Sequence, residues 1–178
     1  MPGDIPLHRS VVDPVDARVV GGQLGRPPRG SWTAAARCPF RRPTVIETFP
    51  VLEDGSPFPT LYYLTCPWLV AYVDGLESAC AVTEWAERLR DAPILRSRMI
   101  AADAQYRSRR ARLAGGIDPT PSVGIAGQKS PLSTKCLHAH VATYLAGLDD
   151  PVGQGVVAST ESITCPSDLC ARFVESDS

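Results

Sequence analysis

The pattern of apolar and polar positions predicts three consecutive strands in the first third of the chain. The segments are residues 31–38, 44–52 and 60–66, and the second of them is rich in β-branched residues. Between the second and third segments, Asp54-Gly55 is a turn signal. We therefore expect an antiparallel meander of about three strands.

The spacing of apolar residues changes to a helical period from residue 67 onward. In residues 67–91 the apolar positions recur at helical spacing, and Pro67 suits the first turn of a helix. Cys80 falls on the same stripe, so we expect its thiol to pack in the core. A second helix is predicted from residue 93 to about 114, and a third from about 135 to 145.

Two shorter helices complete the prediction. One covers residues 15–20 and ends at Gly21-Gly22, and the other lies near residues 167–175. The fold class is therefore α+β, with a small antiparallel sheet of about three strands covered by about three main helices.

Composition along the chain predicts one folded unit with two weakly patterned ends. Residues 1–13 carry proline and glycine with little apolar content, so we expect a flexible tail. Residues 14–153 form the predicted single α+β domain. Residues 154–178 are mostly polar and form a weakly patterned C-terminal segment.

Charge and hydropathy exclude several classes of protein. The 178 residues carry a formal net charge of −1, so there is no overall attraction to nucleic acid or anionic lipid. No apolar run approaches the ~20 residues that a membrane span needs. The N-terminus lacks the basic and apolar regions of a secretory signal. We expect a cytoplasmic protein without a membrane segment, whose six cysteines are mostly reduced.

The hexapeptide KCLHAH, residues 135–140, concentrates soft side chains in one place. It holds Cys136, His138 and His140. Three interpretations remain open, namely a metal site, a reactive thiol with a histidine base, and side chains that bind no ligand.

Two thiols lie at predicted helix starts, where free N–H groups favour a thiolate. Cys66 precedes Pro67, and Cys136 lies in the first turn of the third helix. Cys38 lies at the end of a neighbouring strand. A tetrahedral zinc site could combine Cys66 and Cys136 with His138 or His140, and Cys38 could be a further ligand.

A glycine-rich loop precedes the same helix and offers a second kind of site. The segment GIAGQKS, residues 124–130, places Gly124 and Gly127 ahead of the helix, and Lys135 adds a positive charge. These residues could hold the phosphate of a phosphorylated ligand, although the spacing of a Walker motif is missing. The alternative is a turn that needs no ligand.

Two alternative functions follow from these motifs. A thiol-dependent enzyme acting on a phosphorylated or acyl substrate would use Cys136 as the nucleophile. Its base would be His138 if the first turn is distorted, or His140 if the helix is regular. A polyanion-binding module would instead use residues 96–112, whose six arginines and one aspartate give a local charge of +5. The simpler interpretation of that segment is a solvated helix face.

Several motifs together resemble a known family. The stretches DARVVGGQLGRPPRG, ARCPFRRPTVIETFPVLEDGSPFPTLYYLTCP and KCLHAHVATYLA are similar to the bacterial domain of unknown function 501, which is common in actinobacteria. The likeness covers about residues 16 to 153. It implies a small cytoplasmic factor, often encoded beside a septum-formation initiator and an exopolyphosphatase-type enzyme. A link to cell division or polyphosphate proteins is thus implied by association only.

The resemblance also bears on individual residues. Members of that family usually carry a second histidine at the position of Thr143, and often leucine at that of His140. The resemblance therefore implies that a role of the usual histidine has moved to His140 or has been lost. The family often has glycine at the position of Cys80.

Overall fold

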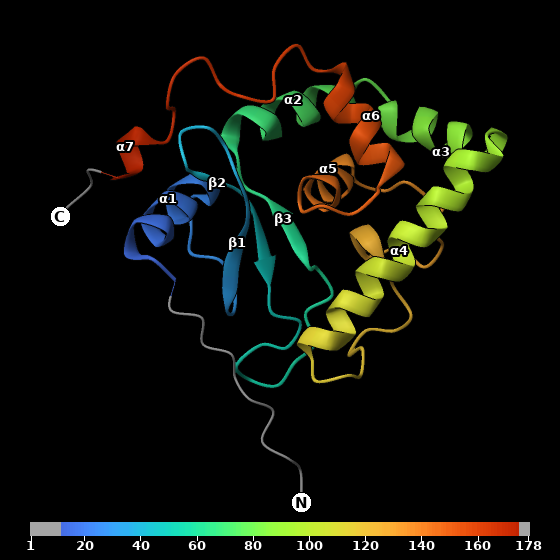
Figure 1. The fold of residues 1–178 in the computed structure, drawn as a ribbon, viewed down its shortest axis with the longest axis horizontal. Coiled ribbons are helices and arrows are strands. Elements are labelled where there is room, and N and C mark those ends of the chain that lie inside the picture. The colour runs from blue at the N-terminus through green and yellow to red at the C-terminus, as the bar shows by residue number, and fades with distance from the viewer. Residues whose placement is uncertain (1–11, 175–178) are drawn as a thin grey trace, which may run out of the picture.

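A three-stranded antiparallel sheet lies at the centre of the molecule (Figure 1). The computed structural model describes residues 12–174. Strands β1 (Trp32–Arg37), β2 (Pro43–Thr48) and β3 (Tyr62–Leu64) follow one another in the order β1-β2-β3. The predicted α+β class and the three-stranded antiparallel sheet are confirmed.

The central strand β2 is buried on both faces, because helices cover the sheet from two sides. Val45 packs with Leu64 in the main core. Its neighbour Ile46 points the other way and packs with Trp32 and Val20 in a second, smaller core. The run of β-branched and apolar residues in this strand therefore reflects burial on two faces.

The helical part of the fold is larger than the prediction of about three main helices. Residues 12–174 contain seven α-helices and one short 3₁₀ helix, which are α1 (Pro14–Leu24), α2 (Pro67–Ser78), α3 (Ala81–Asp91), α4 (Pro93–Leu113), η1 (Ile125–Gly127), α5 (Leu137–Leu145), α6 (Pro151–Ser159) and α7 (Ala171–Val174). Much of the added number comes from short helices, whose apolar faces are too brief to produce a clear period in the sequence.

The predicted helix over residues 67–91 is in fact two helices. The chain leaves the helical conformation at Cys80, whose φ of 65° lies in the left-handed region. This residue ends α2 and begins α3, so the direction of the chain changes there. The prediction that Cys80 packs in the core is wrong, because its side chain is exposed.

Helix α1 continues beyond the glycines that were expected to end it. Asp13 caps its start by accepting hydrogen bonds from the N–H groups of Val15 and Asp16, and Gly25 ends it with a φ of 69°. Gly22 stays inside the helix, where its missing side chain makes room for the ring of Phe173 in α7. A Cβ at Gly22 would lie 2.2 Å from that ring.

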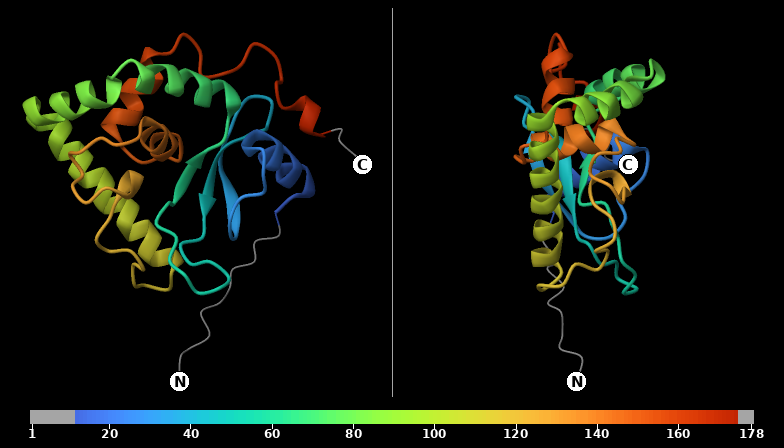
Figure 2. Two further views of the ribbon diagram at one scale, coloured as in Figure 1. Left: turned by 180° about the vertical axis from the view of Figure 1, so that it is seen from behind. Right: turned by 90° about the vertical axis from the view of Figure 1, so that its right-hand side faces the viewer.

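The arrangement of the helices brings distant parts of the chain together (Figures 1 and 2). Helix α5 lies between β3 and α4 and packs on both β3 and α6. Helix α2 lies across one end of the sheet and also contacts α5. This contact between α2 and α5 forms the candidate site.

The predicted domain boundaries remain predictions. Of the expected tail at residues 1–13, residues 1–11 lie outside the part of the chain that the structure describes. Helix α6 runs across the predicted boundary at residue 153. Across residues 12–174, no helix combines the length and apolar character that are needed to pass through a lipid bilayer.

Candidate functional site

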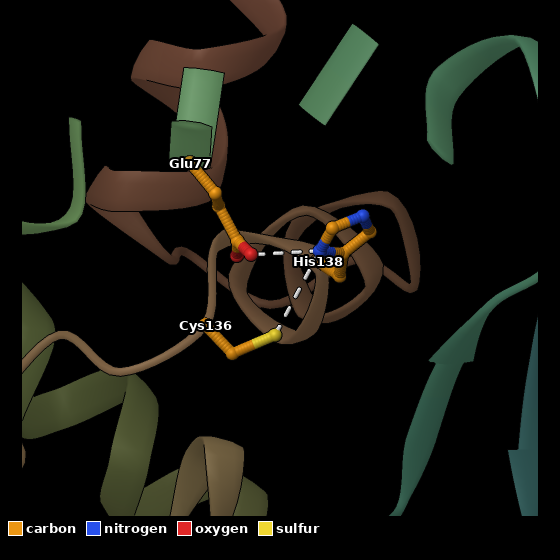
Figure 3. Close-up of side chains that lie close together, drawn as sticks. All are labelled: Glu77, Cys136 and His138. Atoms are coloured by element: carbon orange, nitrogen blue, oxygen red, sulfur yellow. Dashed lines mark hydrogen bonds and ion pairs between the residues drawn. The ribbon is translucent and has the colours of Figure 1, made fainter. Parts of the chain in front are cut away.

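The candidate site forms where the end of α2 meets the start of α5 (Figure 3). Glu77 lies in the last turn of α2, and its side chain points toward the start of α5. Cys136 is the N-cap residue of α5, and His138 lies in the first turn. Cys136 has an extended backbone with a φ of −151°, so the two residues of the KCLHAH motif can turn their side chains toward each other.

Three side chains converge at this point. The Sγ atom of Cys136 lies 3.8 Å from Nδ1 of His138, and Oε1 of Glu77 lies 3.2 Å from the same nitrogen. One atom from each of the three side chains lies within 4.8 Å of the other two. Glu77 is held in place because its Oε1 also accepts a hydrogen bond of 2.6 Å from the N–H of Leu137.

A fourth side chain orients the imidazole. Nε2 of His138 lies 3.2 Å from Oδ1 of Asp74, which is one turn before Glu77 on α2. The hydrogen bond to Cys136 and the nearby charges of Cys136 and Glu77 together raise the pKa of His138 to about 9, although its partial burial acts in the opposite direction. His138 therefore lies between two carboxylates and a thiol, and each of its ring nitrogens has a polar neighbour.

These residues form part of the wall of a pocket of about 630 Å³. Cys136, His138 and Asp74 line it, whereas Glu77 is not among the lining residues. The other lining residues come mainly from α1, β3, α2 and the start of α5, and they include apolar, hydroxyl-bearing and amide side chains, such as Leu24, Thr60, Tyr62, Tyr63, Val70 and Ala139. A small molecule in this pocket would have direct access to the thiol and the imidazole.

The arrangement has two chemical uses. A thiolate, an imidazole nitrogen and a carboxylate are all ligands of zinc, so Cys136, His138 and Glu77 could hold one ion. The same thiol and imidazole could also act as nucleophile and base, with Asp74 orienting the ring.

The structure separates the other predicted metal ligands from this cluster. Cys66 and Cys38 line a different, small pocket, together with Cys165 and Cys170. His140 points away from the site toward α6. It is fully buried, and its Nδ1 lies 2.7 Å from Oδ2 of Asp150.

The position of the usual family histidine is also outside the cluster. Thr143 is buried, and its hydroxyl donates a hydrogen bond of 2.7 Å to the carbonyl oxygen of Ala139. The hydroxyl thus bonds within the helix that carries the site, and Thr143 is absent from the residues that line the pocket.

The glycine-rich loop is occupied by a carboxylate of the protein itself. Asp103 on α4 accepts a hydrogen bond of 3.0 Å from the N–H of Ile125, and a Cβ at Gly124 would lie 1.8 Å from its Oδ1. Gly127 adopts a φ of 65°, which suits glycine. The loop therefore uses its glycines for close packing on Asp103, while the side chain of Lys135 is exposed at the protein surface.

The arginine-rich segment is part of α4, and most of its charges are paired. Four of its six arginines contact carboxylates, in the pairs Arg98–Asp149, Arg107–Asp103, Arg109–Glu47 and Arg110–Asp118. Arg110 is fully buried. Three of these carboxylates lie outside the segment, so they reduce its local charge from +5 to +2.

Sequence reasoning missed both carboxylates of the candidate site. Asp74 and Glu77 are the only acidic residues of α2, and they are three residues apart, so they share a face of the helix. A pair of acids on an otherwise apolar helix is a usable signal. It does not identify the partner, because Glu77 and Cys136 are separated by almost 60 residues.

Comparison with known proteins identifies the family of this chain. The model of a family described as Protein of unknown function (DUF501) matches residues 34–158. This match begins within β1 and contains β2, β3, Glu77 and the KCLHAH motif. Searches of the curated proteins and of the solved structures found no match. The chain therefore belongs to the DUF501 family, as its motifs predicted.

Proposed function

We propose that this protein binds a single divalent transition-metal ion through Cys136, His138 and Glu77, and that the ion faces the neighbouring pocket. Zinc is the metal that this donor set favours. The observation that carries the proposal is the convergence of the three ligand atoms within 4.8 Å of one another. They converge at the wall of a pocket of about 630 Å³.

The distances within the cluster suit a small ion. Zinc bonds of ~2.0–2.3 Å in a tetrahedral arrangement place ligand atoms roughly 3.3–3.8 Å apart. The Sγ–Nδ1 separation of 3.8 Å and the Nδ1–Oε1 separation of 3.2 Å are close to that range. A ligand set of sulfur, nitrogen and one oxygen favours zinc over magnesium or calcium, which prefer oxygen ligands.

The environment of His138 supports the same function. A histidine that binds metal through one ring nitrogen usually donates the other N–H to a carboxylate, which fixes the tautomer and the direction of the ring. Here Nδ1 faces Cys136 and Glu77, while Nε2 faces Asp74 at 3.2 Å. Asp74 therefore has the place of the orienting carboxylate.

Three protein ligands leave one coordination position for a water molecule or a bound ligand, as in catalytic zinc sites. The bound ion would polarise an oxygen atom of the molecule that fills this fourth position. The lining combines apolar side chains with hydroxyl-bearing residues such as Thr60 and Tyr63. We therefore infer a ligand that has an apolar body and one polar group directed at the ion.

A thiol enzyme is the second candidate, because Cys136, His138 and Asp74 follow the order of nucleophile, base and orienting carboxylate. Glu77 favours the metal centre. Its oxygen lies beside Nδ1, the nitrogen that would have to accept the thiol proton. A carboxylate at this place competes with the thiol for that nitrogen, whereas it is a natural third ligand for an ion.

The metal affinity of matched variants tests the proposal. We expect Cys136→Ser and Glu77→Gln to weaken zinc binding at this site by more than the ~10–100-fold that loss of an orienting partner causes, and Asp74→Asn to weaken it by about that amount. Gln at position 77 can still accept the hydrogen bond from Leu137, so the helix start is preserved. Cys80→Ser is the control, since that thiol is exposed and lies outside the site.

The same samples separate the two candidates. Bound zinc should protect Cys136 from iodoacetamide, as measured by mass spectrometry of the labelled peptide. If the wild type and Cys136→Ser bind zinc with equal affinity at this site, the metal centre is rejected. If alkylation of Cys136 near neutral pH is also rapid and insensitive to zinc, the thiol enzyme becomes the better interpretation.

A further inference from the structure

A second group of thiols lies at the start of α2, at the opposite end of this helix from Glu77. Four of the six cysteines line one small pocket. Cys38 follows β1, Cys66 is the N-cap residue of α2, and Cys165 and Cys170 belong to the segment between α6 and α7. Folding thus brings together thiols from three separate parts of the chain.

The pocket encloses these thiols closely. Its volume is about 10 Å³, which leaves room for little more than a single atom or ion. Cys66 and Cys170 are buried, while Cys38 and Cys165 are half-buried.

The segment that carries two of these thiols has few other means of attachment. Residues 160–170 contain only turns and bends, and most of their side chains are exposed or half-buried. Arg42 forms an ion pair of 2.7 Å with Asp168, and the indole N–H of Trp68 donates a hydrogen bond of 2.9 Å to the carbonyl of Ser162. These exposed or partly exposed contacts supply little binding free energy on their own.

We propose that Cys38, Cys66, Cys165 and Cys170 form a structural zinc site with four sulfur ligands, which fastens the C-terminal segment to the sheet and α2. The site is separate from the cluster of Glu77, Cys136 and His138 and does not depend on it. Closed four-thiolate sites are a common structural use of zinc, and their binding free energy stabilises the fold directly.

Binding requires the sulfur atoms to move inward. No three of these thiols lie mutually within 4.8 Å, whereas Zn–S bonds of ~2.3 Å place neighbouring sulfurs roughly 3.8 Å apart. Two of the four ligands, Cys165 and Cys170, lie on a segment without regular secondary structure, which can supply this movement. The other two are anchored beside β1 and at the start of α2.

One contact at the site suits a thiolate. Each of the four thiols releases one proton when it binds, so one Zn²⁺ and four thiolates form a centre with a charge of −2. Arg42 lines the same pocket, where its guanidinium pairs with Asp168. Gln23 already donates a hydrogen bond of 3.3 Å from Nε2 to the sulfur of Cys170, a contact that would also suit a thiolate.

The test uses the Cys136→Ser variant, which removes a ligand of the first site. We expect purified Cys136→Ser protein to contain one equivalent of zinc, with X-ray absorption showing four sulfur neighbours at ~2.3 Å. Adding Cys165→Ser and Cys170→Ser should remove that zinc. Circular dichroism should show that the main fold remains, because both residues lie outside the segments that form the sheet and α5.

Further readouts make each outcome decisive. Cys80→Ser, added to Cys136→Ser as a matched control, should leave the zinc content unchanged. In the protein with Cys136→Ser alone, a chelator should release zinc and increase protease cleavage within residues 160–170. The proposal is rejected if this protein contains no zinc with four sulfur ligands. Thiol titration that shows disulfides among the four cysteines, or four free thiols without zinc, has the same consequence. If the cluster of Glu77, Cys136 and His138 binds no zinc but the four cysteines do, only the proposal for the first site is rejected.

Discussion

Two histidines of one short motif have opposite environments. His138 faces the pocket and two carboxylates, whereas His140 is fully buried and contacts Asp150. Because α5 is regular beyond its first residue, positions two apart point to different sides of the helix. The chemistry of each imidazole is therefore set by the element that it faces, α2 for His138 and α6 for His140.

Asp150 is expected to be a strong determinant of stability at the residue scale. It is fully buried, accepts hydrogen bonds from the N–H groups of Val152 and Gly153, and contacts His140. Asp150→Ala removes a helix cap and leaves a buried imidazole nitrogen without a partner. We expect the free energy of unfolding to fall by about 2–4 kcal/mol, as measured by urea denaturation.

The adjacent residue provides the control for this prediction. Asp149 is exposed and pairs with Arg98 at the surface, so Asp149→Ala should lower the free energy of unfolding by no more than about 1 kcal/mol. A loss of no more than about 1 kcal/mol for Asp150→Ala as well would contradict the expected contribution of its buried contacts.

At the scale of the elements, prolines and one residue in the left-handed conformation set the boundaries of the helices. Four helices have a proline as their first residue, where no backbone N–H is needed, and these are Pro14, Pro67, Pro93 and Pro151. The break between α2 and α3 is different, because it depends on Cys80 with a φ of 65°. Glycine adopts this conformation without the cost that a side chain imposes.

Cys80→Gly is therefore expected to stabilise the protein. Its side chain is exposed, so the substitution loses little packing and relieves the left-handed strain. We expect a gain of about 0.5–1 kcal/mol in the free energy of unfolding. Ala79→Gly is the matched control. Ala79 has a φ of −91°, where glycine only adds freedom to the unfolded chain, so this change should destabilise by about 0.5–1 kcal/mol.

Thermal and urea denaturation of both variants would measure these effects. Opposite signs for two adjacent positions are the diagnostic result. Destabilisation by glycine at both positions would mean that the conformation of Cys80 carries no strain.

A polar seam joins the helical layer to the sheet at the scale of the whole molecule. The hydroxyl of Tyr106 on α4 accepts a hydrogen bond of 2.6 Å from the N–H of Leu61, just before β3. Beside it, Arg110 is fully buried, pairs with Asp118 and donates a hydrogen bond of 2.9 Å to the carbonyl of Pro59. This seam connects α4, the loop after it and the start of β3.

The seam predicts a loss of stability in alkaline solution. Burial raises the pKa of Tyr106 from 10.0 to about 12, so the folded state holds the phenolic proton more tightly than the unfolded state. The stabilising contribution is complete below pH 10 and is lost as the pH rises from 10 to 12. Its size is at most about 3 kcal/mol, from 1.36 kcal/mol per pKa unit.

Tyr106→Phe isolates this effect from the other groups that titrate at high pH. The variant should be less stable near neutral pH by about 1–3 kcal/mol, because the N–H of Leu61 loses its partner. The difference between wild type and variant should then shrink from pH 10 to 12, as measured by urea denaturation at each pH. A difference that stays constant with pH would contradict the raised pKa of Tyr106.

Local patterns predicted much of the framework from the sequence. The three strands and helix α4 follow from residue type and apolar spacing. The third helix was expected from about residue 135, and α5 begins two residues later, at Leu137. Cys136 and His138 were also identified as a pair, since they are only two residues apart. These features depend on interactions between near neighbours along the chain, which the order of residues displays directly.

The full membership of both thiol-containing groups was decided by the tertiary structure. Glu77 joins Cys136 and His138 because α2 packs on α5, while Cys38 and Cys66 lie with Cys165 and Cys170 near the start of α2. Three arginines of α4 pair with carboxylates outside the helix, and the pairs are Arg98–Asp149, Arg109–Glu47 and Arg110–Asp118. The periodicity of one segment shows which face is buried but carries no information about which distant segment will cover it, so these partners appear only when the elements pack.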